Sequence, residues 1–153
     1  MHIKRASVKD VPQISALIRG LSTLYILSPD TEGAEPYLES ISEPAIRGYV
    51  SANNFRYLVV ESEGQLIGVI ALRDNTHLYH MFIAEEFQGQ GMGHKLWETV
   101  KAEAMQEGNI GRFTVNSSLN AVPVYERLGF VPVGNKVEEN GVTFQPMLLV
   151  EDK

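Results

Sequence analysis

The sequence predicts a layered α+β fold in which helices pack on a mixed β-sheet. Residues 11–25 carry apolar side chains at three- and four-residue spacing, which is typical of an amphipathic helix. Residues 55–61 and 65–73 are β-rich runs separated by a short glycine-containing turn. A third such run at 78–84 passes through a glycine-rich stretch into a helical pattern at 91–107. Because strands and helices alternate irregularly along the chain, we expect a mixed sheet with helices packed on it.

The first half of the chain is expected to form a short strand, two helices and a β-hairpin. Residues 2–7 (HIKRAS) form the strand, and Ser7 and Asp10 are spaced like the capping box of the helix that follows. A second helix is expected at about residues 43–52. Gly64 can adopt the positive φ that the turn of the hairpin requires. The apolar stripe of the first helix consists of Val11, Ile14, Leu17, Ile18, Leu21, Leu24 and Tyr25.

The second half is expected to form the long helix at 91–107, two shorter elements and a final hairpin. Gly108 ends the long helix, whose buried stripe is predicted to be Met92, Leu96, Val100 and Ala104. The run at 112–116 (RFTVN) is predicted as a strand, and 121–128 as a short helix that Gly129 ends. Asn140-Gly141 is a strong signal for a two-residue hairpin turn.

Composition limits the classes of function. The 153 residues suit a single domain, 1–153, and carry a formal charge of −6 with the basic residues scattered, so we expect no nucleic-acid partner. No apolar run approaches the length of a membrane span, and residues 1–10 lack the apolar segment of a signal peptide. We therefore expect a cytoplasmic protein without a membrane partner. The absence of cysteine removes disulfides and thiolate ligands, and we expect no metal site.

The stretch QGQGMGH, residues 88–94, lies where a predicted strand leads into a helix. Free backbone N–H groups at a helix start bind anions, and glycines let a phosphate approach them closely. The alternative is a tight turn with small residues for packing. A Walker loop would need a Gly-Lys-Ser or Gly-Lys-Thr sequence, and a dinucleotide-binding loop would need glycine where His94 stands. The stretch therefore favours a phosphate site of another kind.

Two motifs give the sequence a family resemblance. Gln88, Gly91 and Gly93 fit the pattern Gln/Arg-x-x-Gly-x-Gly/Ala, and "NAVPVYERLGF" carries Asn120, Tyr125 and a Gly-Phe pair. With these motifs the chain resembles the GNAT superfamily of acyl-CoA-dependent N-acetyltransferases along nearly its whole length. The resemblance implies a mostly antiparallel sheet of six to seven strands with helices on both faces. It also implies that two parallel strands, at 78–83 and 112–116, splay apart.

The resemblance assigns coenzyme contacts to specific residues. The backbone of the strand end would pair with the pantetheine arm of acetyl-CoA. Asn120 would contact the same arm through its side chain, although a helix N-cap is the simpler role for that position. The strand residues are Met81, Phe82 and Ile83, and the residues expected to hold the pyrophosphate are Gln88, Gly89, Gln90, Gly91, Met92, Gly93 and His94.

The resemblance also implies the chemistry. Tyr125 stands where the family has the general acid for the coenzyme sulfur, and its alternative role is that of a core tyrosine. The N–H of Phe82 or Ile83 would meet the oxyanion. His77 stands where several members carry a base, His80 is the alternative base, and in some relatives water serves. Strict strand alternation would put the two histidines on opposite faces, which argues against a metal site between them.

The sequence thus predicts an N-acetyltransferase that moves acetyl from acetyl-CoA to a primary amine of a small molecule or peptide, in a ternary complex. The alternatives are a non-catalytic coenzyme A-binding module with a regulatory or sensing role, and a binding protein for another nucleotide. Residues 24–54 and the hairpin at Asn140 are expected to flank the acceptor. Four acidic residues in the first segment could attract a cationic acceptor, but an acidic loop is usually only solvated, and we favour that interpretation. The four are Glu32, Glu35, Glu39 and Glu43. Many family members are dimers, so a homodimer is an open alternative.

Overall fold

The computed structural model describes residues 1–21, 35–139 and 142–151. Its helices are α1 (Val11–Leu21), α2 (Glu35–Ser40), α3 (Glu43–Ser51), α4 (Met92–Gln106) and α5 (Val122–Leu128). Its strands are β1 (His2–Arg5), β2 (Phe55–Ser62), β3 (Gln65–Arg73), β4 (His77–Ile83), β5 (Arg112–Ser118), β6 (Val131–Pro132), β7 (Val137–Glu139) and β8 (Val142–Val150). Short 3-10 turns at Val8–Asp10, Glu85–Phe87 and Leu119–Ala121 connect some of these elements.

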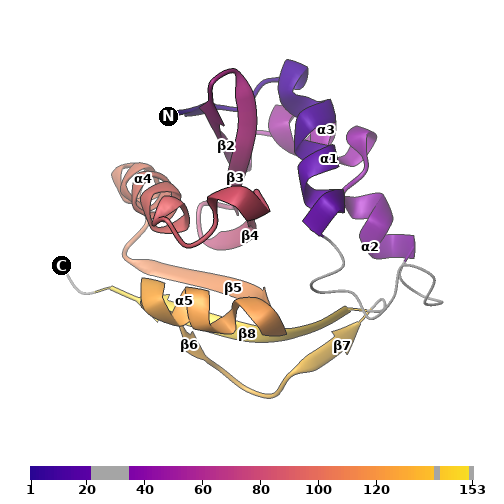
Figure 1. Cartoon of the computed structure of the whole chain (residues 1–153). Coiled ribbons are helices and arrows are strands. Elements are labelled where there is room, and N and C mark those ends of the chain that lie inside the picture. The colour runs from indigo at the N-terminus through magenta and orange to yellow at the C-terminus, as the bar shows by residue number, and fades with distance from the viewer. Residues whose placement is uncertain (22–34, 140–141, 152–153) are drawn as a thin grey trace.

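The strands form one mixed sheet in the order β1-β2-β3-β4-β5-β8-β6, with β7 also paired to β8. The pairing of β4 with β5 is parallel, and the other described pairs are antiparallel. In Figure 1, β5 and β8 turn away from the direction of β2 and β3. The described sheet has eight strands, and the very short β6 and β7 account for the difference from the six to seven expected.

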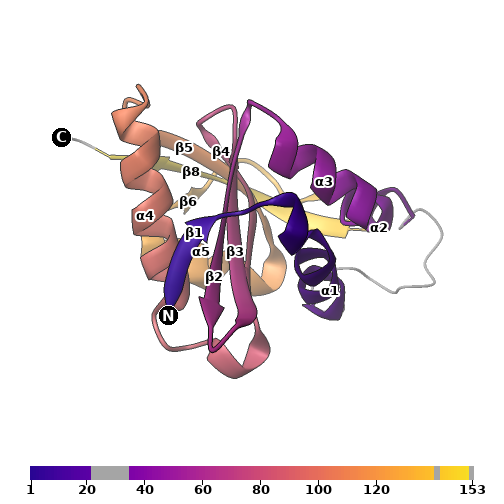
Figure 2. The same cartoon turned by 90° about the horizontal axis from the view of Figure 1, so that it is seen from above.

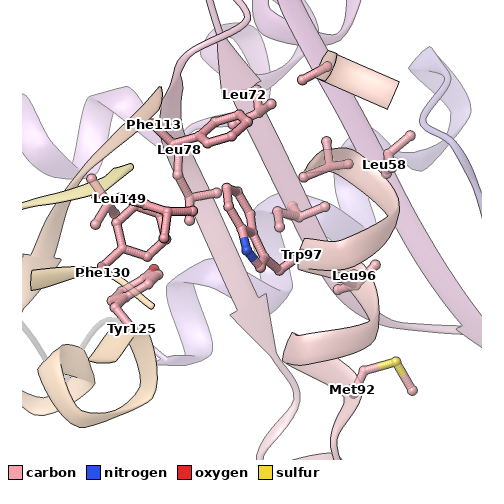
Figure 3. Close-up of a cluster of buried hydrophobic side chains, with 14 of the residues drawn as sticks. Leu58, Leu72, Leu78, Met92, Leu96, Trp97, Phe113, Tyr125, Phe130 and Leu149 are labelled. Carbon is pink, nitrogen blue, oxygen red and sulfur yellow. The ribbon is translucent and has the colours of Figure 1, made fainter. Parts of the chain in front are cut away.

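Helices cover both faces of the sheet, which confirms the predicted α+β architecture. Figure 2 shows α4 on one side of β1, β2 and β3, and α1 and α3 on the other. On the α4 face, Trp97, Phe113 and Phe130 meet in a buried aromatic group (Figure 3). On the opposite face, Ile14 and Ile46 belong to a second core that packs on the same sheet. The sheet therefore lies between two hydrophobic cores, one on each of its faces.

Local sequence signals set the ends of the helices as expected. The Asp10 carboxylate accepts a hydrogen bond from the Ser7 N–H at 2.9 Å, which completes the predicted capping box before α1. The Ser42 hydroxyl caps α3 by accepting from the Ala45 N–H. Gly129 follows α5 at a φ of 107°, in the left-handed region that favours glycine. The predicted buried stripe of α4 is confirmed, since all four of its residues are buried: Met92, Leu96, Val100 and Ala104.

A bulge in β4 contradicts the strict alternation that the sequence suggested. Ala71 pairs with His80 and Leu72 with Leu78, so Tyr79 is an extra residue in β4. Leu78 and Met81 consequently both pack on the α4 face, although they are three residues apart. His80 contacts Tyr57 on the opposite face. The expectation that the two histidines face opposite ways is therefore wrong, because an inserted residue shifts every following side chain to the other face.

Some predicted features differ from the structure or lie outside the described residues. The sequence did not predict α2, a six-residue helix that contacts α3. Leu24 and Tyr25, assigned to the first helix, and the Asn140-Gly141 turn lie outside the described residues. The strands beside that turn pair antiparallel, with Glu139 opposite Val142. None of the described helices combines the length and apolar character that a bilayer crossing needs.

Asn109 links the end of α4 to β5, and we expect Asn109→Ala to be strongly destabilising. Its amide donates to the carbonyls of Asn75 and Arg112 at 2.8 and 2.9 Å, and its carbonyl accepts from the N–H groups of Gly111 and Arg112. Asn109 is 7% exposed, so truncation leaves buried backbone groups unpaired and should lower the free energy of unfolding by about 2–4 kcal/mol. Chemical denaturation measures the loss, and the exposed Asn135→Ala is the control. A loss below about 0.5 kcal/mol would contradict the assigned role.

Candidate active site

The parallel strands β4 and β5 pair over a short distance and then separate. Their register contains two pairs, His77 with Thr114 and Leu78 with Val115. Beyond these pairs, β4 continues to Ile83 and β5 to Ser118. This separation is the splay that the sequence motifs implied, and it leaves a gap in the middle of the sheet.

A cleft of about 1190 Å³ occupies this gap. It exceeds the roughly 300–1,000 Å³ of an ordinary small-ligand pocket, so it can hold a large cosubstrate together with an acceptor. Of the residues predicted for the site, His77 and Gln90 do not line the cleft. The predicted residues that do line it are His80, Met81, Phe82, Ile83, Gln88, Gly89, Gly91, Met92, Gly93, His94, Asn120 and Tyr125.

The edge of β4 offers backbone hydrogen-bonding groups to the cleft. The Ala84 N–H donates to the Ile67 carbonyl of β3 at 2.8 Å, and by antiparallel alternation the N–H of Phe82 also points toward β3. The backbone groups of Met81 and Ile83 then point away from β3, toward the splay. The Ile83 carbonyl accepts from the Gln88 side chain at 2.9 Å, which agrees with this direction. Of the two predicted oxyanion donors, the hydrogen-bond pattern between β3 and β4 thus favours the N–H of Ile83, which points toward the splay, over that of Phe82, which points toward β3.

The glycine loop, residues 88–94, connects β4 to α4 by way of a 3-10 turn. Gly89 and Gly91 have φ angles of 77° and 80°, which a residue with a side chain rarely adopts. No described residue accepts a hydrogen bond from the N–H groups of 89–94, whereas the N–H of Lys95 donates to the Gly91 carbonyl. The loop therefore presents a row of unpaired donors at the start of a 15-residue helix, whose dipole adds partial positive charge.

Side chains hold the glycine loop in place. The Gln88 amide anchors its start to the end of β4, and the Gln90 amide donates to the Glu86 carbonyl at 3.2 Å. Gln90 thus supports the loop from outside the cleft. Glu85 and Glu86 are exposed in the preceding 3-10 turn.

Tyr125 closes one wall of the cleft from α5. The residue is 7% exposed and packs edge-on against Phe130, as Figure 3 shows. Its hydroxyl makes no hydrogen bond to a described residue, yet the side chain lines the cleft. Burial raises the pKa of Tyr125, so the phenol stays protonated at neutral pH and can act as a proton donor. Tyr125 is thus a core residue that also borders the cleft, and its role as the general acid stays a prediction.

Asn120 lies in the 3-10 turn Leu119–Ala121, immediately before α5, and lines the cleft. The N-cap residue of α5 is Ala121, whose side chain makes no capping hydrogen bond, so Asn120 is not itself the N-cap. The contact of Asn120 with the pantetheine arm stays a prediction.

The two histidines differ in their access to the cleft. His77 Nδ1 lies 2.8 Å from the Thr114 hydroxyl, at the point where β4 and β5 still pair. His80 lines the cleft, and its Nδ1 lies 2.8 Å from the Tyr57 hydroxyl. Burial, reinforced by Arg73, lowers the pKa of His77 to about 4, and burial lowers that of His80 to about 3. Both rings are neutral at pH 7, and of the two only His80 lines the cleft.

These pKa shifts predict a loss of stability in mild acid. The unfolded chain protonates both histidines near pH 6.5, whereas the folded chain keeps them neutral until about pH 4 and 3. The unfolded state therefore binds more protons below pH 6.5, so the free energy of unfolding falls as pH drops from there toward 3. Denaturation at several pH values should show a smaller decline for His80→Gln than for the wild type. Exposed His2→Gln is the control, and equal slopes for all three proteins would refute the assignment.

Sequence reasoning missed a group of residues that line the cleft away from the glycine loop. These residues come from six separate elements, and no motif marks them in the sequence. They include Leu21, Arg73, Tyr79, Asn116, Glu139 and Phe144. Of the segments predicted to flank the acceptor, the β7–β8 hairpin does contribute, through Glu139 and Phe144. Neither Glu39 nor Glu43 lines the cleft, and Glu32 lies outside the described residues.

Comparisons with known proteins agree with this geometry. A family model described as an acetyltransferase (GNAT) domain matches residues 26–151. Human N-acetyltransferase 8B is 28% identical over 137 residues, covering 79% of this chain and 60% of that protein. The 5-NmdU N-acetyltransferase of Pseudomonas phage PaMx11 is 32% identical over 92 residues, covering 55% of this chain and 63% of that protein. The chain thus spans less than two thirds of the length of these relatives.

Among solved structures, the PaiA N-acetyltransferase from Thermoplasma acidophilum, crystallised with coenzyme A, has the same fold. Its TM-score is 0.80 at 18% identity, with 98% of each chain covered. At this low identity, the similarity extends to the arrangement of helices and strands.

Proposed function

The chain belongs to the GNAT acetyltransferase family, and from this premise we propose that it transfers an acetyl group from acetyl-CoA to a primary amine of a small molecule or peptide. The observation that carries the proposal is the glycine loop, whose unpaired N–H groups open into the same cleft as the Tyr125 hydroxyl. The acetyltransferase names of the matched relatives support the reaction class.

The described residues fit the parts of acetyl-CoA. The N–H groups of residues 89–94 would bind the diphosphate, since they have no protein acceptor. The cleft-facing backbone groups of Met81 and the N–H of Ile83 would pair with the amides of the pantetheine arm, as an added strand does. Asn120 would contact the same arm from the opposite wall. This arrangement would direct the thioester toward Tyr125.

Direct attack within a ternary complex requires three protein functions: stabilisation of the oxyanion, a proton for the departing sulfur and an acceptor for the proton of the amine. The amine nitrogen forms a bond to the acetyl carbon, and the carbon–sulfur bond breaks. Whichever of the N–H groups of Met81 and Ile83 the pantetheine arm leaves unpaired would stabilise the oxyanion that develops in between. The Tyr125 hydroxyl would deliver a proton to the departing sulfur. The oxyanion donor lies on β4 and the proton donor on α5, so the two groups would approach the thioester from different walls of the cleft.

The proton that leaves the amine needs an acceptor. His80 is the histidine that borders the cleft, and its neutral ring can accept a hydrogen bond. With a pKa of about 3, however, His80 would hold a proton only transiently. We propose that His80 orients water that carries the proton out, in place of His77, which the sequence favoured as the base.

The test is release of free thiol from acetyl-CoA in the presence of amines, amino acids, polyamines and peptides. Amine-dependent release, with the acetylated amine identified by mass spectrometry, is the expected result. A non-catalytic coenzyme A-binding module would bind acetyl-CoA without releasing thiol in any mixture. Calorimetry with acetyl-CoA, ATP and NAD separates the third alternative, since tighter binding of either nucleotide would contradict the coenzyme assignment.

A further inference from the structure

Several residues that line the cleft have no part in the proposed coenzyme contacts. They are Leu21, Arg73, Tyr79, Glu139 and Phe144, and we call their part of the cleft the acceptor half. Arg73 is the last residue of β3 and pairs with His77 at the start of β4. Six residues along a strand span roughly 20 Å, so the backbone of Arg73 lies about that distance from Ile83 and the loop. The Arg73 guanidinium extends toward Tyr79, 5.3 Å from the centre of its ring, and so lies nearer to the middle of β4. An acceptor, and not the diphosphate, is therefore the ligand within reach of Arg73.

The Arg73 guanidinium has N–H groups that are not engaged by the described residues. Its Nε lies 3.8 Å from an oxygen of Asp74, whose side chain is 65% exposed, and this is a weak ion pair. The other oxygen of Asp74 accepts from the Asn54 amide at 3.2 Å. No oxygen among residues 1–21, 35–139 and 142–151 accepts a hydrogen bond from the Arg73 guanidinium. A planar group with several free N–H donors matches a carboxylate, which can accept two of them in parallel.

The Arg73 guanidinium is also held in position. Its central carbon lies 5.3 Å from the centre of the Tyr79 ring, within cation–π range. Tyr79 in turn packs edge-on against Tyr49 and Phe55, and its hydroxyl lies 3.2 Å from that of Tyr49. The bulge in β4 places Tyr79 on this side of the sheet. An arginine fixed by an aromatic group loses less side-chain freedom when it binds an anion.

We propose that the acceptor is an amine that also carries a carboxylate, which Arg73 binds, and an apolar or aromatic body. Tyr79, Phe82 and Phe144 supply apolar surface for that body. Glu139 is the acidic residue in the described lining and can attract the ammonium group. A hydrophobic amino acid has all three features, whereas a polyamine lacks the carboxylate. This inference rests on the proposed function and specifies its acceptor.

The first test compares phenylalanine with phenethylamine, which differ only in the carboxylate. Wild-type protein should acetylate phenylalanine with a kcat/KM at least about tenfold higher. Arg73→Met keeps the alkyl packing on Tyr79 and should lower kcat/KM for phenylalanine about ten- to hundredfold, with phenethylamine changed by less than about threefold. Arg73→Lys should fall between, because it keeps the charge without the planar fork. Arg112→Met, an exposed arginine outside the cleft, is the matched control.

A second test does not need turnover. Calorimetry should show that N-acetylphenylalanine binds to protein saturated with coenzyme A, and that Arg73→Met weakens this binding about ten- to hundredfold while Arg112→Met does not. Equal use of phenylalanine and phenethylamine, a preference for spermidine, or no loss of binding in Arg73→Met would overturn the inference. Thiol release with some other amine would leave the proposed function standing in each case. Absence of thiol release with every amine, together with intact product binding, would overturn the proposed function instead.

Discussion

Tyr125→Phe should lower kcat for acetyl transfer by about 10²- to 10³-fold while binding of acetyl-CoA changes little. The substitution removes one hydroxyl and keeps the ring that packs against Phe130. Because burial keeps the Tyr125 phenol protonated, its absence should leave the departing sulfur without a proton donor over the whole neutral pH range. Steady-state kinetics of thiol release give kcat, and calorimetry gives the affinity for acetyl-CoA.

Glu126→Gln on the same helix is the matched control for Tyr125→Phe, because Glu126 is exposed and lies outside the cleft. It should retain kcat within about twofold. If Tyr125→Phe also retained kcat, the proton would reach sulfur from water, and Tyr125 would be a core residue alone. If acetyl-CoA binding disappeared, the hydroxyl would serve binding instead of proton transfer.

Gly91→Ala should weaken coenzyme A binding about tenfold or more. Gly91 has a φ of 80°, and an alanine in the left-handed region costs roughly 1–2 kcal/mol. The added methyl group would meet no protein atom within 4 Å, so packing within the protein is not the cause of the loss. The cost arises because alanine favours another loop conformation in the free protein and because the methyl group hinders approach of the diphosphate to the backbone. Calorimetry with coenzyme A measures the change.

Gly93→Ala is the control that separates the effect of the left-handed backbone at Gly91 from the effect of simply adding a methyl group to the glycine loop. Gly93 lies inside α4 without a positive φ, and an added methyl group would lie 3.7 Å from Met81 Cε, an ordinary contact. Alanine favours a helix over glycine, so binding should change by less than about threefold. Equal losses in the two variants would show that the left-handed conformation is not what coenzyme binding requires.

The residues proposed to hold the coenzyme could be assigned from the sequence because they lie in short stretches of the chain. The loop from Gln88 to His94 needs glycines at a strand-to-helix junction, and both the junction and the glycines are visible in a short stretch. The Asn120 and Tyr125 motif is likewise contained within one turn and one short helix. Local conformational preference predicted the glycine loop, and the roles of Asn120 and Tyr125 are those that the family resemblance implies.

The histidine assignment needed the tertiary structure. Alternation along 77–83 is a local rule, but the bulge at Tyr79 arises from the pairing of β4 with β3 and cannot be read from β4 alone. Placement of His80 at the cleft and of His77 beside Thr114 depends on that pairing and on where β4 leaves β5.

By itself, the sequence determined most of the order of the elements and the glycine loop, since both depend on short-range conformational preference, and its two motifs supplied the family resemblance that marks Tyr125 as the candidate acid. The tertiary structure decided which other side chains line the cleft. Arg73, Tyr79 and Glu139 belong to three strands, and they line one cleft because the sheet pairs these strands in a particular order and register. Contacts between segments distant in sequence follow from the packing of the whole chain, and no short pattern encodes them.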